Sequence, residues 1–573
     1  MAKDAKNSMA AARTGRRWWL MAALLFVFFR ALPNISYPIG RDQATYFVIG
    51  EGLLQGHQLY RQLWDNKPPG IFAVYALLAK LFGHVMWSVG LVDIVWLLII
   101  SFCIFRFAEQ YLGPVAAAIA AGVNADWHCR FGYTDACQTE CFLMVLVFAG
   151  YFVVAGDGRR PLARHFAAGL YLGAAFWQKY NALAFLPWLA LLPCLDWSGL
   201  DASPRRLRLR VSRCVLVKRV AGLLAGFSLV VAVVLAYFYL AGSWPSLKEV
   251  QLEVLPRYAA MAERTSRYWA MAAARVVLYL GLGTWVATGL SFMLAEWRDL
   301  SRLAPVLVSA GVGFLCTASQ VRFAALSFET CFPFFAMIWG YLVVKIYVEV
   351  GATARSPATG RRTPARAAAF ILVAIALFWP LRTEVKAVSE RYRDLEAWRR
   401  NRDAFFASYP ATRFLVENLG GQMRVIQALR QVSSPGDGVF VWGTDPLIYY
   451  LTGRRPPTRF LSNIFLMGPW SPPAWREELV HDLGKSPPAF IVVAQHDNFG
   501  ITLTSLDSEQ YLSVYPSLAH FIAASYDLTA TFPDFVLYRR NPPRRLNFAA
   551  PKLIPPEVSH HSAVLTYGLE GRG

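Results

Sequence analysis

Cysteine is scarce in this chain, and none of its eight cysteines lies beyond residue 331. A disulfide framework in the last third is therefore excluded. Cys129 and Cys137 flank one short loop and could pair, but two buried thiols are the favoured interpretation. No spacing of His and Cys resembles a zinc site, so we expect no metal.

A glycine-rich phosphate loop and an internal repeat are also missing. Without a phosphate loop after an expected strand, we predict no nucleotide site and no cofactor. Many transporters are built from repeated halves, so the missing repeat speaks against a transporter.

Charged residues are few, at 16% of the chain against 56% hydrophobic residues. These proportions exclude an ordinary soluble domain and are typical of a polytopic membrane protein. Arg13, Arg16 and Arg17 precede the first apolar run, and no good cleavage site follows it. We therefore expect an uncleaved first span instead of a signal peptide.

The charges that are present are mostly basic, giving a net charge of +20. The arginines cluster in short links between apolar runs, as in residues 204–210. Such clusters mark the cytoplasmic side of a membrane protein, so we expect no nucleic-acid partner. The links with most arginines are residues 1–17, 157–165, 196–219 and 351–366.

Apolar runs predict about eleven transmembrane helices of roughly 20 residues each, several of them short. The runs lie near residues 18–38, 86–107, 114–125, 138–156, 166–177, 181–195, 217–241, 270–294, 304–318, 326–349 and 367–381. The basic links place the N-terminus in the cytoplasm, and an odd number of spans then puts the C-terminal region on the opposite, outer face. That face also receives residues 37–85 and 242–269.

The C-terminal part has a different pattern from the rest of the chain. Short apolar strands at 438–442, 489–494 and 535–538 alternate with helical stretches such as 422–432 and 509–524. This alternation predicts a small α/β domain. We expect a helical membrane domain over 1–384 and an α/β domain over 385–573, with a loosely ordered tail from about residue 545.

Asp42 and Lys67 lie in the first outer segment, between two expected helices. A carboxylate and an ammonium group in one such loop suit removal of a proton from a hydroxyl beside a bound phosphate. Asp42 is also placed to cap the helix that follows it, and the two roles are compatible.

A second pair of carboxylates, Asp135 and Glu140, enters a later span. Carboxylates in such positions are costly and tend to be functional. Asp135 is also suited to cap the following helix, whereas Glu140 lies one turn deeper, where a cap explains it less well. Which of the two is functional stays open. Asp93, inside an expected span, is interpreted as a packing or pairing residue outside the site.

Lys67, Lys179 and Arg322 are expected on the outer face, whereas lysine and arginine usually gather on the cytoplasmic side of a membrane protein. Pairing with an anionic lipid phosphate would explain them. Snorkelling to the membrane interface is an equal alternative for Lys179 alone. Residues 257–267 carry further arginines but fit a solvated amphipathic loop.

Together these motifs resemble the bacterial family 39-like glycosyltransferases of the GT-C superfamily. This family is related to protein O-mannosyltransferases and to the aminoarabinose transferase that modifies lipid A. The resemblance spans most of the chain. It is carried by Arg41-Asp42-Gln43-Ala44-Thr45-Tyr46, Trp64-Asp65-Asn66-Lys67-Pro68-Pro69 and residues 56–60, 139–140, 173–179, 439–449 and 453–456.

The resemblance implies a GT-C type fold and transfer of a sugar from a polyprenyl-phosphate donor, with inversion, outside the cytoplasm. It implies that Asp42 activates the acceptor, that Glu140 matches a second acidic position near it, and that Lys67 and Lys179 lie near the donor phosphate. The acceptor would be a cell-envelope glycan, lipid or protein. The enzyme would lie among the lipids of a bacterial inner membrane, with its C-terminal domain in the periplasm.

One stretch departs from the family pattern. After an Arg-Phe pair such as Arg322-Phe323, these enzymes often carry His-Tyr before a proline, whereas this chain has Phe328-Glu329 before Pro333. Donor contacts at this helix are therefore expected to differ. Two other classes of function remain open: a transporter or flippase of lipid-linked sugars, and an inactive scaffold, against which the Asp42 and Lys67 pair argues.

Overall fold

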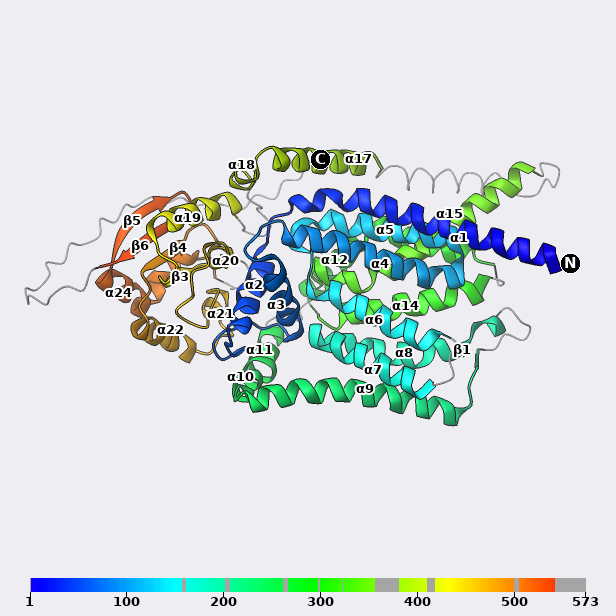
Figure 1. Cartoon of the computed structure of the whole chain (residues 1–573), viewed down its shortest axis with the longest axis horizontal. Helices are drawn as coiled ribbons and strands as arrows, with labels where there is room; N and C mark the ends of the chain where they lie inside the picture. The colour runs from blue at the N-terminus through cyan, green and yellow to red at the C-terminus, as the bar shows by residue number, and fades with distance from the viewer. Residues whose placement is uncertain are drawn as a thin grey trace, which may run out of the picture.

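The computed structural model describes residues 2–156, 161–200, 207–260, 266–296, 299–321, 323–355, 381–409, 418–498 and 504–541. Figure 1 shows two parts along the long axis. A bundle of long helices forms one part, and a smaller part with the strands forms the other. The short helices α2 (Arg41–Leu54) and α3 (Gly70–Phe82) lie between them.

Five segments within the described ranges are long and apolar enough to cross a membrane: Thr14–Ser36, Ser88–Leu112, Arg213–Leu240, Leu300–Ala318 and Phe332–Glu349. They lie in α1 (Ala2–Ala31) with η1 (Leu32–Ser36), α4 (Ser88–Leu112), α9 (Arg213–Leu240), α14 (Leu300–Ala318) and α15 (Phe332–Arg355). The pair α12 (Ser266–Leu280) and α13 (Leu282–Leu294) is bent by 78° and would add a sixth span.

Other expected spans correspond to shorter or broken helices. These are α5 (Pro114–Phe131), α6 (Thr139–Ala155) and α7 (Pro161–Gln178). The run 181–195 is divided into η3 (Tyr180–Ala184), α8 (Phe185–Leu191) and η4 (Leu192–Cys194), and Pro193 begins the last piece. The run 367–381 lies almost wholly outside the described residues. The structure therefore establishes several apolar helices, while eleven spans stays a prediction.

Close backbone contact holds α7 against α9. A Cβ atom added to Gly226 would clash with the carbonyl oxygen of Phe166, and one added to Gly169 would clash with that of Leu223. Small residues at a helix crossing allow this approach, as is common between membrane helices. The end of α7, where Lys179 follows, is thereby fixed relative to the bundle.

A four-stranded sheet forms the core of the C-terminal part, in the order β3-β4-β6-β5. The strands β3 (Val439–Trp442) and β4 (Phe490–Ala494) are parallel. The strand β6 (Phe535–Arg540) is antiparallel to β4 and to β5 (Tyr526–Phe532). The helices α19 (Leu419–Val432), α20 (Leu447–Thr452), α21 (Ile464–Met467), α22 (Ala474–Lys485), α23 (Ser508–Tyr511) and α24 (Pro516–Ser525) accompany it.

Three of these strands occur where the apolar runs predicted them, but β5 was not predicted. Most residues of β5 are exposed or half-exposed, so the strand has no buried run that would mark it. The expected helix at 509–524 is divided between α23 and α24, and Pro516 starts the second piece. The predicted domain boundary at residue 385 falls inside α17 (Leu381–Arg400), and the tail beyond residue 541 lies outside the described residues.

The sheet part packs directly on the first outer segment. The rings of Phe47 and Tyr450 stack with centroids 4.5 Å apart, and the Tyr450 hydroxyl donates to the Gly83 carbonyl at 2.5 Å. The amide of Trp64 donates to the Arg459 carbonyl at 2.9 Å. The Arg459 side chain also donates to the Tyr60 carbonyl, across a sequence separation of 399 residues. The loop before Lys67 is therefore supported by residues far later in the chain.

Candidate functional site

Asp42 lies in the first turn of α2, one residue after the helix begins. The N-cap is Gly40, whose backbone is extended. The expected capping role of Asp42 is therefore wrong, because the cap position is two residues earlier. Its half-buried carboxylate lies near the positive end of the helix dipole.

Hydrogen bonds tie the start of α2 to the loop over residues 132–138. The Gln43 amide donates to the carbonyls of Tyr133 and Ala136 at 2.7 and 2.9 Å. From the same helix, the Tyr46 hydroxyl donates to the Gln138 side chain at 3.1 Å. Because each buried donor has a fixed acceptor, the loop that carries Asp135 is held against the turn that carries Asp42.

The backbone of Lys67 is fixed on both sides. Its amide donates to an Asp65 carboxylate oxygen at 2.8 Å, and its carbonyl accepts from the Tyr60 hydroxyl at 2.7 Å. Gln251, from the π-helix η6 (Glu249–Val254), donates to the same carbonyl at 3.3 Å and to the Tyr60 hydroxyl at 3.1 Å. The loop before Lys67 and the η6 helix thus meet at the Lys67 carbonyl.

Lys67 is held in its charged form by surrounding carboxylates. Burial alone lowers the pKa of its ammonium group, but Asp42, Asp65 and Glu140 outweigh burial and raise the pKa above its ordinary value. Burial raises the pKa of Asp65 to about 6, although Lys67 opposes this. Lys67 therefore lies within electrostatic reach of Asp42, as the loop pattern predicted.

Glu140 and Lys179 form a buried ion pair between α6 and the turn after α7. The Lys179 ammonium donates to one oxygen of Glu140, and the Thr139 hydroxyl donates to the other at 2.5 Å. Glu140 is fully buried and Lys179 is 19% exposed. Lys179 is thus paired with Glu140, and this contact accounts for the position of its side chain without snorkelling. Burial lowers its pKa, Glu140 opposes this, and the nearby charge of Lys67 lowers it further.

Asp135 is buried beside the same group of charges. It follows the short η2 helix (Gly132–Thr134), and the N-cap of α6 is Gln138, so the expected cap by Asp135 is wrong. Burial raises the pKa of Asp135 well above its usual range, and the Glu329 carboxylate adds to this. Asp135 is therefore suited to hold a proton, whereas Glu140 is engaged by Lys179.

The third expected cation, Arg322, lies outside the described residues. Its neighbour Glu329, in the stretch that departs from the family pattern, belongs to η8 (Ala325–Thr330) and bonds to His128 at 2.7 Å. Asp93 bonds to the other ring nitrogen of His128 at 2.9 Å, which agrees with its interpretation as a pairing residue. The sequence interpretation did not assign Asp65, Gln251, His128 or Glu329 to the site. Among these four, only Glu329 carried a usable signal, because it is an acidic residue in apolar surroundings, as Asp93 is.

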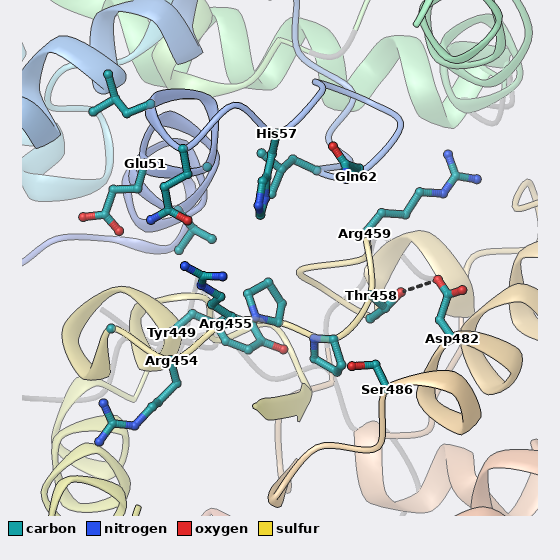
Figure 2. Close-up of a pocket in the computed structure, with 18 of the residues that line it drawn as sticks. Glu51, His57, Gln62, Tyr449, Arg454, Arg455, Thr458, Arg459, Asp482 and Ser486 are labelled. Atoms are coloured by element: carbon teal, nitrogen blue, oxygen red, sulfur yellow. Dashed lines mark hydrogen bonds between the residues drawn. The ribbon is translucent and has the colours of Figure 1, made fainter. Parts of the chain in front are cut away.

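A cavity of about 670 Å³ opens at the opposite end of α2 (Figure 2). Glu51 and His57 line one wall, and Arg455, Thr458 and Asp482 line the other, with a hydrogen bond of 3.5 Å between the last two. None of Asp42, Lys67, Asp135, Glu140 and Lys179 lines this cavity. It therefore belongs to the junction between the two parts of the protein, not to the predicted site.

A family model described as dolichyl-phosphate-mannose-protein mannosyltransferase matches residues 66–206. The matched stretch contains Lys67, Asp135, Glu140 and Lys179 but begins after Asp42. Over this stretch the chain is similar to protein mannosyltransferases, which are among the relatives that the motifs indicated. Among curated protein sequences, none matches the chain significantly.

Two solved structures are similar along most of the chain. ArnT from Cupriavidus metallidurans, bound to undecaprenyl phosphate, is 16% identical with a TM-score of 0.49, covering 92% of this chain and 98% of that chain. The Archaeoglobus fulgidus oligosaccharyltransferase tethered to an acceptor peptide is 12% identical with a TM-score of 0.44, covering 92% and 74%.

Proposed function

We propose that this protein transfers a sugar from a polyprenyl-phosphate donor to an acceptor on the periplasmic side of a bacterial inner membrane, with inversion at the anomeric carbon. One observation carries the proposal: Asp42 and Lys67, from the segment 37–85, lie within electrostatic reach of the pair that Glu140 of α6 forms with Lys179 after α7. The family match supports it, since the matched stretch includes both lysines.

In the proposed reaction, Asp42 accepts the proton of the acceptor hydroxyl or amine as its oxygen or nitrogen attacks the anomeric carbon. The bond from that carbon to the phosphate oxygen breaks, and its electron pair leaves with the polyprenyl phosphate. Charge grows on the leaving phosphate, so fixed cations stabilise the transition state more than the ground state. Lys67 serves this role, because surrounding carboxylates keep it charged and its backbone is fixed.

Lys179 has a double role in this proposal. Before the donor binds, it is neutralised by Glu140 in a buried pair. A donor phosphate beside Lys67 and Lys179 would reduce the repulsion between these two neighbouring ammonium groups. Glu140 then positions Lys179, and Asp135 remains the second candidate for contact with the acceptor. Arg322 stays a proposed phosphate ligand from the sequence alone.

A transfer assay with purified protein tests the proposal. The protein is incubated in detergent with polyprenyl-phosphate sugars carrying a labelled sugar, and with cell-envelope extract as a source of acceptors. Release of polyprenyl phosphate together with label on an acceptor is expected for at least one donor. The same protein is then reconstituted in sealed vesicles. Label that crosses their membrane still attached to the lipid, with no transfer in either experiment, would identify a flippase and contradict the proposal.

A further inference from the structure

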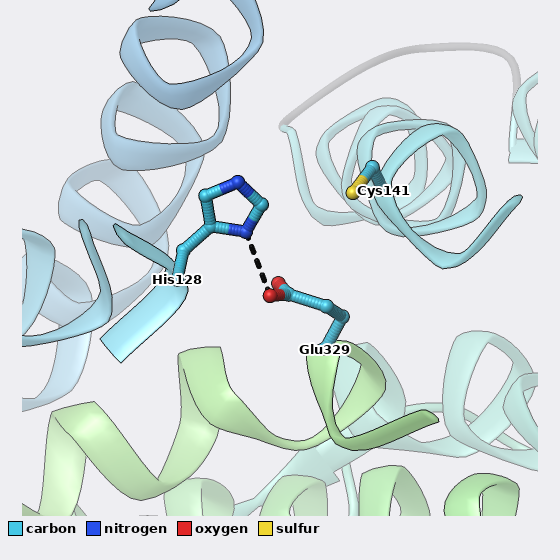
Figure 3. A group of neighbouring side chains, drawn as sticks. All are labelled: His128, Cys141 and Glu329. Carbon is cyan, nitrogen blue, oxygen red and sulfur yellow. Dashed lines mark hydrogen bonds and ion pairs between the residues drawn. The ribbon is translucent and has the colours of Figure 1, made fainter. Parts of the chain in front are cut away.

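Three side chains that are able to bind a metal converge inside the helical bundle (Figure 3). His128 comes from α5, Cys141 from α6 and Glu329 from η8. Their ligand atoms lie within 4.8 Å of one another. The residues are 1%, 0% and 2% exposed. The cluster shares no residue with the site of Asp42 and Lys67, although Cys141 directly follows Glu140 in the chain.

The His128 ring is fixed in direction before any ligand is considered. Its Nε2 atom lies 2.9 Å from an Asp93 oxygen, and the other Asp93 oxygen accepts from the Asn34 amide at 2.8 Å. The ring of Trp96 packs on it with centroids 4.7 Å apart. Metal-binding histidines characteristically donate their second N–H to a carboxylate in this way, which fixes the tautomer. The Nδ1 atom then faces Glu329 and the Cys141 thiol.

The cluster gathers three different kinds of ligand atom around the fixed ring. Asp93 occupies Nε2 at 2.9 Å, and a Glu329 oxygen lies 2.7 Å from Nδ1. The Cys141 thiol, which also lies 3.7 Å from the Asp135 carbonyl oxygen, completes the group. A divalent cation between Nδ1, the Cys141 sulfur and Glu329 would replace the contact between Nδ1 and Glu329 with bonds from one nitrogen, one sulfur and one oxygen.

We propose that His128, Cys141 and Glu329 bind a zinc-type divalent ion, with Asp93 orienting the histidine. Nitrogen, thiolate and carboxylate ligands together are typical of zinc. With bonds of about 2.0–2.3 Å, such an ion would push Nδ1 and the Glu329 oxygen slightly further apart. The ion joins three segments directly behind Asp135 and Glu140, so it would hold the wall of the transfer site in place. No local spacing of His and Cys marks this site, because the ligands are brought together only by the fold.

Metal analysis of the full chain, purified through a tag without histidines, tests the site. We expect about one equivalent of zinc by elemental mass spectrometry. The Cys141→Ser and His128→Ala variants should retain less than about a tenth of it, since they lose ligands. Cys103→Ser, which removes a buried thiol of α4 outside the cluster, should keep the full equivalent. Stoichiometric zinc in Cys141→Ser would overturn the proposal.

A second measurement detects the thiolate ligand directly. The wild-type protein is stripped with a chelator, loaded with Co²⁺ and followed by absorption spectroscopy. A thiolate-to-cobalt charge-transfer band, absent from Co²⁺-treated Cys141→Ser but present in Cys103→Ser, is the expected result. A wild-type protein that binds neither zinc nor Co²⁺ would show that His128 is held by its carboxylates alone. Because both readouts are independent of sugar transfer, failure of the proposed reaction would leave them unchanged.

Discussion

Lys179 donates to a buried oxygen of Glu140, and this contact joins the turn after α7 to the first turn of α6. Thr139 occupies the second Glu140 oxygen, so the carboxylate is fixed on both sides. The pair stands beside the charge of Lys67, which acts on both residues. It therefore sets how many positive charges the site can offer to a phosphate.

The stability of this pair can be measured by a double-mutant cycle. Lys179→Ala leaves Glu140 buried without its partner and should cost about 3 kcal/mol of stability. The double variant Lys179→Ala/Glu140→Gln should recover much of that loss, because no unpaired charge remains. Thermal unfolding in detergent measures all four proteins. Additive effects of the two changes would show that the residues do not interact.

The second prediction concerns binding of the lipid phosphate. Lys67→Ala and Lys179→Ala should both lower the affinity for polyprenyl phosphate without a sugar, since each removes a charge-assisted contact. Lys67→Ala should also lower turnover, because the leaving-group charge grows toward the transition state. Lys80→Ala, on the exposed side of α3 in the same outer segment, is the matched control. If both site variants bind the lipid like the parent protein, the phosphate site lies elsewhere.

Asp65 makes the stability of the protein depend on pH. Its pKa is raised to about 6 in the folded protein, so the folded state binds more protons than the unfolded state between pH 4 and 6. Stability should therefore fall as the pH rises through this window. Asp65→Asn keeps an oxygen for the Lys67 amide and should flatten the dependence, whereas Asp403→Asn on an exposed helix should not. An unchanged melting profile in Asp65→Asn would contradict this.

Topology is the fourth prediction. The basic links place the N-terminus in the cytoplasm and the sheet part in the periplasm. Alkaline phosphatase, whose disulfides require an oxidising compartment, should be active when fused after residue 541. A fluorescent reporter that works only in the cytoplasm should stay dark at the same position. An inactive phosphatase and a bright fluorescent reporter would instead place the sheet part in the cytoplasm, which contradicts the proposed compartment of the reaction.

Local patterns predicted the parts of the fold that depend on neighbouring residues. The strands β3 and β4 are fully buried apolar runs, as the sequence indicated, and the helix expected after Asp42 is present as α2. The exposed strand β5 carries no such run, so it could be recognised only through its pairing with β6. The helix cap was placed two residues late, because Gly40 caps without a side chain.

The candidate site was predicted in its residue types but not in its pairings. A carboxylate and a lysine in a membrane loop indicate chemistry because both are costly there. The Glu140–Lys179 pair and the bonds of His128 join positions far apart in the sequence, with separations of 39 and 201 residues. Such contacts follow from helix packing, and no local spacing encodes them.

The turnover of Asp42→Asn tests the central claim most directly. Asn is nearly the same size but cannot accept the acceptor proton, and no cap is lost, because Gly40 occupies the N-cap. With a donor that the parent protein uses, the variant should bind polyprenyl phosphate normally while turnover falls roughly a hundredfold or more. Turnover near that of the parent protein would show that Asp42 is not the base and would contradict the proposed mechanism.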